Sequence, residues 1–359
     1  MRTFSYPGGI YNATPPRVVF GPGSVAGVGA EVVRLGARRA LVVTTPGRRA
    51  LGERIAALIG ERCVGVLAEA VSQVPIELAR RGREQAQALE ADCLVSVGGG
   101  ASVGLGKGIA LGHPLPIIAL PTTYSGSEMT GFCGITIDGV KRMHTSLDML
   151  ARTVIYDAEL SLSLPNAVSA ASAMNALAHC IDAIYVPSLS PLLAAAAVDG
   201  AAAIVGSLGR VLAVPDDLQA RNELLYGAYL GGAALTGGFA LQHGLAHVLG
   251  GSFGVEHGLA HALILPQVAA YNAHFAPHAL GRIAAALGTD NLGGTLFDLL
   301  TASGLPTRLA DLGLDEADLQ RAVAVTLETE KEGSPNPGPV TAAAVGEILR
   351  RAHQGVRPG

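Results

Sequence analysis

The order of hydrophobic and polar residues divides the chain into two parts. In the first part, short apolar runs rich in β-branched residues alternate with amphipathic segments. The runs lie at residues 17–20, 40–44, 63–67, 93–97 and 117–120. Near-continuous apolar runs are typical of strands that are buried on both faces of a parallel sheet.

The segments between these runs have helical periodicity. They lie at residues 24–35, 48–59, 75–90 and 104–111. This alternation of strands and helices predicts an open, doubly wound α/β domain with a parallel sheet. After Leu164 and Pro165 the strand signals almost vanish, and Ala- and Leu-rich helical segments continue to the end. We therefore predict an α/β domain over residues 1–160 and an all-α domain over residues 161–359.

Composition excludes several classes of protein. The 359 residues carry a formal net charge of −4. No basic excess is available for a phosphate backbone, which argues against a nucleic-acid partner. The cysteines lie far apart and form no Cys-x-x-Cys pair; they are Cys63, Cys93, Cys133 and Cys180. This spacing favours free thiols in a reducing cytosol over a disulfide framework.

The chain offers no obvious segment for secretion or membrane insertion. Residues 1–9 lack an apolar signal core. The longest apolar stretch, residues 192–214, is interrupted by Asp199, Ser207 and Arg210. Such interruptions favour a buried helix over a membrane span. We expect a cytoplasmic protein without a membrane partner.

A glycine-rich turn follows the apolar run at residues 93–97. Three glycines, residues 98–100, lead from this run into a helical segment that carries Lys107. Glycines let a backbone come close to a diphosphate, and a helix N-terminus offers free N–H groups with a favourable dipole. The dinucleotide fingerprint is incomplete, because Val103 stands at its third glycine position. Alone, the turn is equally consistent with a tight strand-to-helix connection.

A second turn, after the run at residues 117–120, strengthens the case for a ligand. Hydroxyl side chains gather there beside a glycine, at Thr122, Thr123, Ser125 and Ser127. Ligands of open parallel sheets bind outside the carboxyl ends of the strands. The alternative is an ordinary helix cap, with Glu128 near the start of the next helix. Two such turns after neighbouring strands favour a dinucleotide site, and because Thr44-Thr45 brings no carboxylate, NADH and NADPH both remain open.

Four of the ten histidines gather in one stretch of the second half, at His243, His247, His257 and His261. His243 and His247 are four residues apart, so they share one face of a helix. We expect Gly250-Gly251 to break that helix, which lets His257 return to the same pocket. His261 is expected to face elsewhere and to be structural.

A further polar pair, Asn175 and His179, has the same spacing in an apolar helix. Two helical pairs and a returning histidine resemble the layout of a divalent metal site. The alternative for each histidine alone is a satisfied core residue. Burial of five polar side chains without a purpose is costly, which favours a site.

These motifs together resemble the iron-containing alcohol dehydrogenase superfamily, which includes glycerol dehydrogenases and, more distantly, dehydroquinate synthases. The resemblance runs through nearly the whole chain. It covers residues 18–24, 98–100, 121–123, 156–165, 243–257 and 304–308. It implies a dehydroquinate synthase-like fold, with an N-terminal doubly wound parallel-sheet nucleotide-binding domain, a C-terminal helical domain and an active site between them.

The resemblance also implies individual roles. Residues along the cofactor diphosphate are Gly98, Gly99, Ala101 and Ser102. Residues on its adenosine and nicotinamide side are Thr122, Thr123, Ser125 and Ser127, with Lys141 aligned more loosely. Where relatives carry the metal ligands Asp, His, His and His, this chain has Asn175, His179, His243 and His257. His247 matches the position next to the nicotinamide.

Two departures from the superfamily pattern narrow the expected activity. Asn175 is a neutral amide with weaker affinity for a cation than aspartate, and Gly104 stands where many relatives have an aspartate. Both changes resemble one branch, the maleylacetate reductases, whose activity is not expected to require a metal. The implied function is NAD(P)H-dependent reduction of the conjugated C=C of 2-maleylacetate to 3-oxoadipate in bacterial degradation of aromatic compounds. It implies a homodimer, a small dicarboxylate substrate and no metal.

Hydride addition to this alkene creates an enolate, and hydrogen-bond donors suffice for its delocalised charge. We expect His243, surrounded by Asn175, His179 and His257, to hold the ketone oxygen and to supply the following proton. A protonated cluster would also attract two carboxylates. The alternatives are a metal-dependent alcohol or polyol dehydrogenase on the same fold, a lyase like dehydroquinate synthase, and a non-catalytic binding protein.

Overall fold

The computed structural model describes residues 16–138, 140–330 and 334–359. The prediction that the N-terminal residues carry no signal core lies outside these ranges. The first half of the chain builds a sheet of six parallel strands in the order β1-β8-β5-β4-β2-β3. The strands are β1 (Arg17–Phe20), β2 (Ala40–Thr44), β3 (Cys63–Ala68), β4 (Cys93–Gly98), β5 (Ile117–Pro121) and β8 (Thr153–Tyr156).

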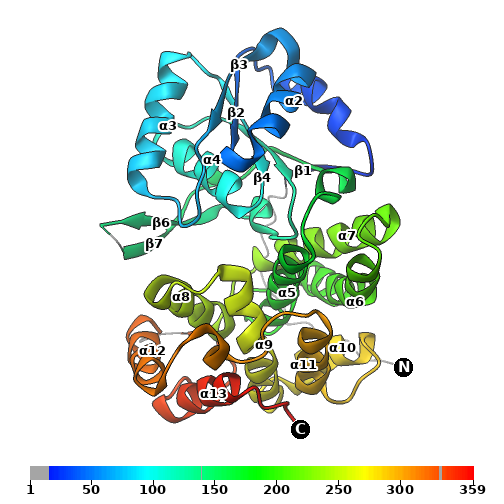
Figure 1. The fold of residues 1–359 in the computed structure, drawn as a ribbon, viewed down its shortest axis with the longest axis vertical. Coiled ribbons are helices and arrows are strands. Elements are labelled where there is room, and N and C mark those ends of the chain that lie inside the picture. Colours follow the sequence, from blue (N-terminus) through cyan, green and yellow to red (C-terminus); the bar gives the residue numbers. More distant parts are fainter. Residues whose placement is uncertain (1–15, 139, 331–333) are drawn as a thin grey trace.

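Helices cover both faces of this sheet because alternate side chains of each strand point to opposite sides. Val42 and Val95 belong to a core cluster with helices α1 (Val28–Arg34) and α2 (Arg49–Ile59). Leu41 and Leu94 belong to the other cluster, with α3 (Ile76–Ala88) and α4 (Gly100–Gly112). Figure 1 shows α2 and α3 on opposite sides of the strands. The prediction of a doubly wound α/β fold is confirmed.

The apolar runs predicted five strands to within one residue at each end, but the pattern missed three others. One is β8, which lies between β1 and β5 in the sheet. The others are β6 (Phe132–Ile137) and β7 (Val140–Thr145), which form an antiparallel hairpin. In Figure 1 this hairpin projects to the left of the sheet. The predicted helix at residues 104–111 begins earlier, at Gly100, because Gly99 is already extended as its N-cap.

The second half is helical throughout its described residues, as predicted. Its helices are α5 (Asn166–Ala183), α6 (Pro191–Ala213), α7 (Leu218–Leu235), α8 (Leu241–Phe253), α9 (His257–Ala273), α10 (Pro277–Ala286), α11 (Leu292–Ala302), α12 (Glu316–Thr329) and α13 (Ala342–Gln354). Short 3₁₀ turns lie at Ser24–Gly27, Pro46–Arg48, Gly60–Arg62, Ser127–Met129, Leu147–Met149, Ala158–Ser161 and Leu309–Leu312. The last strand ends at Tyr156 and α5 begins after Pro165, whose ring suits a helix start.

Helix α6 is the one described helix that is long and apolar enough to cross a membrane by length and composition, with a mean hydropathy of 1.7. One of its faces packs in the helical half, where Ala197, Ala201 and Ile204 are fully buried. The other face is open, and Leu192 at its start is 72% exposed. The prediction of a buried helix therefore holds for one face of α6.

Candidate functional site

The glycine turn leaves backbone N–H groups open at the start of α4. Gly98 ends β4 with a φ of 142°, which only glycine adopts easily. A Cβ atom on Gly99 would lie 2.8 Å from the Thr123 side chain, whereas one on Gly100 would meet nothing within 4 Å. No side chain caps the helix, and the buried Ser102 hydroxyl has no partner among the described residues. This turn fits a diphosphate held by backbone N–H groups and the helix dipole.

The hydroxyl-rich loop lies directly beside this turn. The Thr122 N–H donates to the Gly98 carbonyl oxygen at 3.1 Å, which joins the ends of β4 and β5. Thr122 is buried and Thr123 packs against Gly99. The predicted dinucleotide residues Gly98, Gly99, Ala101, Ser102, Thr122, Thr123, Ser125 and Ser127 therefore come from two adjacent turns at the carboxyl edge of one sheet. They fit NADH or NADPH.

A buried lysine anchors the hydroxyl-rich loop from below. The Lys107 ammonium group donates to the Ser127 carbonyl oxygen at 2.6 Å, the Thr130 hydroxyl at 3.0 Å and the Phe132 carbonyl oxygen at 3.0 Å. Burial lowers the pKa of Lys107 to about 8. Because the Lys107 ammonium group bonds to Ser127, Thr130 and Phe132, it holds the end of this loop against the start of β6.

The Ser125 carbonyl oxygen joins the two predicted sites. It contacts His179 Nε2 at 2.8 Å and accepts from the Asn175 side-chain amide at 3.3 Å. The loop comes close enough because Gly126 has a φ of +71°, and its Cβ would lie 3.0 Å from Gly232 of α7. The polar pair of α5 is thus tied to the loop that carries the predicted cofactor contacts.

From Ser125 a line of short contacts leads inward. His179 Nδ1 lies 2.9 Å from His243 Nε2, and His243 Nδ1 lies 2.7 Å from a carboxylate oxygen of Asp182. A carboxylate only accepts, so His243 carries a hydrogen on Nδ1. The Ser125 carbonyl oxygen also only accepts, so His179 donates to it from Nε2. A hydrogen therefore lies between His179 Nδ1 and His243 Nε2 only when one of the two rings carries hydrogens on both nitrogens.

Asp182 is the member of this line that the sequence reasoning missed. Its carboxylate is fully buried and also accepts from the Ala240 N–H at 2.7 Å and the Tyr185 hydroxyl at 2.5 Å. Burial alone would raise the pKa of Asp182, but the bonds from His243, Tyr185 and Ala240 lower it. The signal was present, because residues 175, 179 and 182 share one face of α5.

His247 and His257 lie beside this line and are half-buried. Their rings are stacked, with centroids 5.7 Å apart and planes 13° from parallel. Neither ring has a hydrogen bond to another described residue, so their nitrogens are free for a ligand. Of the clustered histidines, these two are the most accessible.

The prediction that His261 faces elsewhere is wrong. Its ring centroid lies 4.6 Å from that of His243 and 4.7 Å from that of His257. It is fully buried, and the Gln242 amide contacts its Nδ1 at 3.3 Å. His261 lies one turn after His257 on α9, and the crossing of α8 and α9 brings both rings to the cluster.

The predicted break of α8 at Gly250-Gly251 is also wrong. The helix continues through both glycines and ends at Phe253, where Gly254 takes a φ of +70°. Glu256 then caps α9 by accepting from two N–H groups, so that His257 is the first residue of the new helix. His257 returns to the cluster as expected, with the turn placed four residues later.

The histidines are not the cationic cluster that we expected. Burial, followed by the charge of His243, lowers the pKa of His179 to about 3. Burial, followed by the charge of Lys141, lowers the pKa of His247 to about 3, and burial puts the pKa values of His257 and His261 well below 6.5. These four rings are neutral at neutral pH, because a dry site disfavours the charged form.

Lys141 of the β6–β7 hairpin is the cation that faces this cluster from the first half. Its side chain lies along Gly134, and its charge acts on both His247 and His257. Burial lowers the pKa of Lys141. Nearby, the rings of Phe132 and Phe239 lie 5.8 Å apart and connect the hairpin to the loop before α8.

The donors at the metal-ligand positions do not fit a divalent cation. Asn175 turns its amide nitrogen to Ser125, and its oxygen has no partner among the described residues. His179 and His243 contact each other. Within residues 16–138, 140–330 and 334–359, no three His, Cys, Asp or Glu side chains converge on one point. We therefore derive no step through a metal.

Comparison with known proteins identifies the family of this chain. The profile of iron-containing alcohol dehydrogenase matches residues 15–158, and that of the C-terminal part of the Fe-containing alcohol dehydrogenase family matches residues 169–353. A maleylacetate reductase of Burkholderia cepacia is 44% identical over 97% of this chain and 99% of its own.

Solved structures give the same result. A putative alcohol dehydrogenase from Ralstonia eutropha JMP134 has 45% identity and a TM-score of 0.95 over 99% of this chain and 100% of its own. The maleylacetate reductase from Agrobacterium tumefaciens has 40% identity and a TM-score of 0.92, with 100% of both chains covered. The chain therefore belongs to the iron-containing alcohol dehydrogenase family.

Proposed function

We propose that the protein is an oxidoreductase that reduces the conjugated C=C bond of 2-maleylacetate to give 3-oxoadipate, with NADH or NADPH as the reductant. The observation that carries the proposal is the contact of the Ser125 carbonyl oxygen with both Asn175 and His179. There, Asn175 replaces a charged ligand, and a line of two histidines and a buried carboxylate begins. Identity of 36–44% to several maleylacetate reductases over nearly the whole chain supports it.

The cofactor side would be held by the backbone of Gly98 and Gly99, by Ala101 and Ser102 at the start of α4, and by the hydroxyl-rich loop. When bound, NADH or NADPH supplies the hydride. Thr122, Thr123, Ser125 and Ser127 orient its ribose and nicotinamide side. Lys141 closes the site from the hairpin.

The histidine side would handle the charge that develops on the substrate ketone oxygen. His243 has its Nδ1 hydrogen committed to Asp182, so it donates to the substrate oxygen through Nε2 only after that nitrogen has taken up a second hydrogen from solvent and given up its contact with His179. In this imidazolium form, which the Asp182 carboxylate stabilises, we assign His243 the oxyanion contact, and the Nε2 hydrogen is the proton that then passes to the substrate. His179, His257 and Asn175 shape this position, and His247 faces the nicotinamide. The other rings of the cluster are neutral, and Lys141 supplies the positive charge for a dicarboxylate.

The rival activity is a metal-dependent alcohol or polyol dehydrogenase, which the family name and the relative from Ralstonia eutropha favour. An alkoxide intermediate benefits more from a Lewis acid than a delocalised enolate does. The site residues instead tie Asn175 and His179 to Ser125. This arrangement supports reduction without a metal.

One experiment separates the two activities. The purified protein is assayed with maleylacetate and NADH, and with NADPH, before and after exhaustive chelation, and its metal content is measured. We expect turnover that survives chelation. Turnover of simple alcohols that depends on added metal, with no reduction of maleylacetate, would overturn the proposal.

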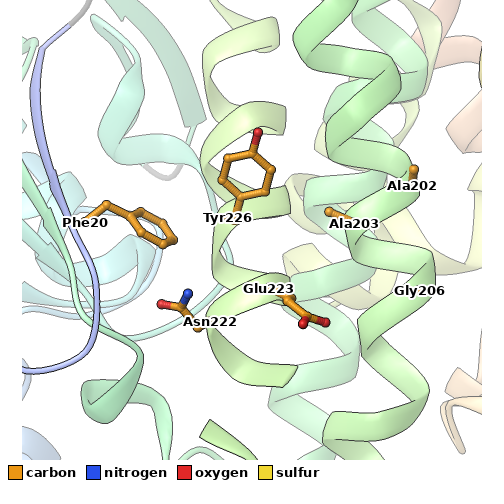
Figure 2. Close-up of a pocket in the computed structure, with 7 residues that line it drawn as sticks. All are labelled: Phe20, Ala202, Ala203, Gly206, Asn222, Glu223 and Tyr226. Atoms are coloured by element: carbon orange, nitrogen blue, oxygen red, sulfur yellow. The ribbon is translucent and has the colours of Figure 1, made fainter. Parts of the chain in front are cut away.

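We also propose that the protein works in the cytoplasm as a homodimer. Among the described residues strand β1 is an edge of the sheet, and a groove of about 440 Å³ lies beside its end. Figure 2 shows Phe20 and Tyr226 facing this groove from β1 and α7. An unpaired edge strand beside open apolar surface is suited to a second copy. Light scattering at micromolar concentration tests this, and a monomer mass would exclude it.

A further inference from the structure

The line of contacts through His243 does not stop at Asp182. The Tyr185 hydroxyl donates to Asp182 at 2.5 Å, and the Asn272 side-chain amide donates to the Tyr185 oxygen at 3.1 Å. Asn272 and Asn336 then form a reciprocal amide pair at 2.8 and 3.0 Å. Asn336 also donates to the Gly338 carbonyl oxygen at 2.8 Å. A relay of buried and half-buried side chains thus connects His243 with the loop before α13.

Each member of the relay has a fixed orientation. Asp182 only accepts, so the Tyr185 hydrogen points to it and the Tyr185 oxygen must accept from Asn272. The amide nitrogen of Asn272 uses both hydrogens, one on Tyr185 and one on Asn336. Its oxygen accepts from Asn336. Turning the Asn272 amide over would place two acceptors against each other in a fully buried position, which is costly.

The fixed orientations matter because the last member of the relay, Asp182, contacts a nitrogen of His243. Asp182 receives four hydrogen bonds, two of them from the backbone at Ala240 and His243. These backbone bonds tie the carboxylate to the start of α8, and the Tyr185 bond holds its other oxygen. The carboxylate therefore cannot rotate away from His243 Nδ1. A histidine that is held in this way has one tautomer and one ring orientation.

We propose that Asp182, Tyr185 and Asn272 are positioning residues that fix His243 with its hydrogen on Nδ1 and its Nε2 toward the substrate, and that Asn336 is the outer end of this relay. This inference rests on the proposed function only for its predicted effects on kcat. A purely structural relay would affect folding and cofactor binding together. A positioning relay lowers kcat and leaves NADH binding intact.

The main test is Tyr185→Phe, which removes one oxygen and preserves the ring. We expect kcat for maleylacetate to fall about 10-fold, the range for residues that orient a ligating or catalytic histidine. The NADH dissociation constant, measured by fluorescence, should remain within about twofold. Tyr271→Phe is the matched control, because its hydroxyl donates to Pro339 of the same loop but lies outside the relay. It should leave kcat unchanged.

The effect should decrease along the relay. Asp182→Asn should lower kcat by about 10²-fold or more, since an amide can impose the wrong tautomer. Asn336→Ala should have a smaller effect than Tyr185→Phe. Equal losses at all three positions, or losses matched by weaker NADH binding, would overturn the positioning role.

A readout without turnover separates this inference from the proposed function. A short bond between a histidine N–H and a carboxylate gives a proton resonance far downfield of the backbone amides. We expect the wild-type protein to show it, and His243→Ala and Asp182→Asn to lose it. Tyr185→Phe should shift it, whereas Tyr271→Phe should leave it in place. If the wild-type protein and the variants give these resonances but the wild-type protein does not reduce maleylacetate, the proposed function is wrong and the positioning relay is supported. If wild type is active and Tyr185→Phe changes neither kcat nor the resonance, only the relay fails.

Discussion

The cofactor side and the histidine side of the site meet at the Ser125 carbonyl oxygen, but they are held by different means. The cofactor side is made of backbone turns at adjacent strand ends, with hydroxyls and one buried lysine behind them. The histidine side consists of rings from α5, α8 and α9 around a buried carboxylate. The first side is open backbone that a charged ligand can approach. The second is largely buried and is fixed by directed hydrogen bonds to a carboxylate.

We expect this difference to separate cofactor binding from chemistry. Changes on the cofactor side should alter cofactor affinity, and changes on the histidine side should alter turnover. The following predictions test that division, from the largest expected effect to the smallest.

His243→Ala should abolish most turnover. We expect kcat to fall about 10²- to 10⁴-fold, the usual contribution of a general acid or base, with the NADH dissociation constant unchanged. Steady-state kinetics and NADH fluorescence provide the two measurements. The exposed His278→Ala serves as control. Near-normal turnover of the His243 variant would remove this residue from the mechanism.

Stability should fall in acid because the histidine cluster resists protonation. Unfolded histidines take up protons near pH 6.5, whereas His179 and His247 do so only near pH 3 in the folded protein. Between these values the unfolded state binds more protons. The free energy of unfolding should therefore fall by about 1.4 kcal/mol per pH unit for each such histidine. Urea unfolding from about pH 7 to about pH 5 measures this slope, and stability that does not fall toward pH 5 would contradict it.

Lys107→Met should loosen the cofactor loop. The substitution leaves the Ser127 and Phe132 carbonyl oxygens without their buried donor, at a cost of about 1–3 kcal/mol in stability. We expect the KM for NADH to rise several-fold while kcat changes little. The exposed Arg80→Met on α3 is the control. A fall in kcat with an unchanged KM for NADH would contradict the assignment of Lys107 to cofactor binding.

Gly100→Val should weaken cofactor binding without destabilising the protein. A Cβ atom there meets no protein atom within 4 Å, so the fold has room for it. The added side chain would instead occupy the approach to the open helix N-terminus, and we expect about a 10-fold rise in the NADH dissociation constant. Calorimetry of folding and of NADH binding gives both quantities. Unchanged binding would mean that the turn is only a tight connection.

The sequence alone determined the parts of the molecule that depend on local pattern. Five strands followed from apolar runs, and the glycine turn and hydroxyl-rich loop followed from residues adjacent in the chain. Asn175 stood out in the sequence because a neutral amide occupies a position where the family resemblance implies a metal-binding aspartate. Strand β8 was missed, although it is no shorter than β1 and strands on both sides stabilise it.

Only the tertiary structure decided how the histidine side works. The positions of His257 and His261 depend on where α8 ends and on how it crosses α9. The sequence analysis placed the end of α8 too early, at a glycine pair. The neutrality of the rings follows from burial by elements far apart in the chain. Asp182 gained its role because the fold brings His243 and Ala240 to it, 61 and 58 residues away. Local pattern reports what a residue can do, but burial and hydrogen-bond partners, which are set by packing, decide its charge and orientation.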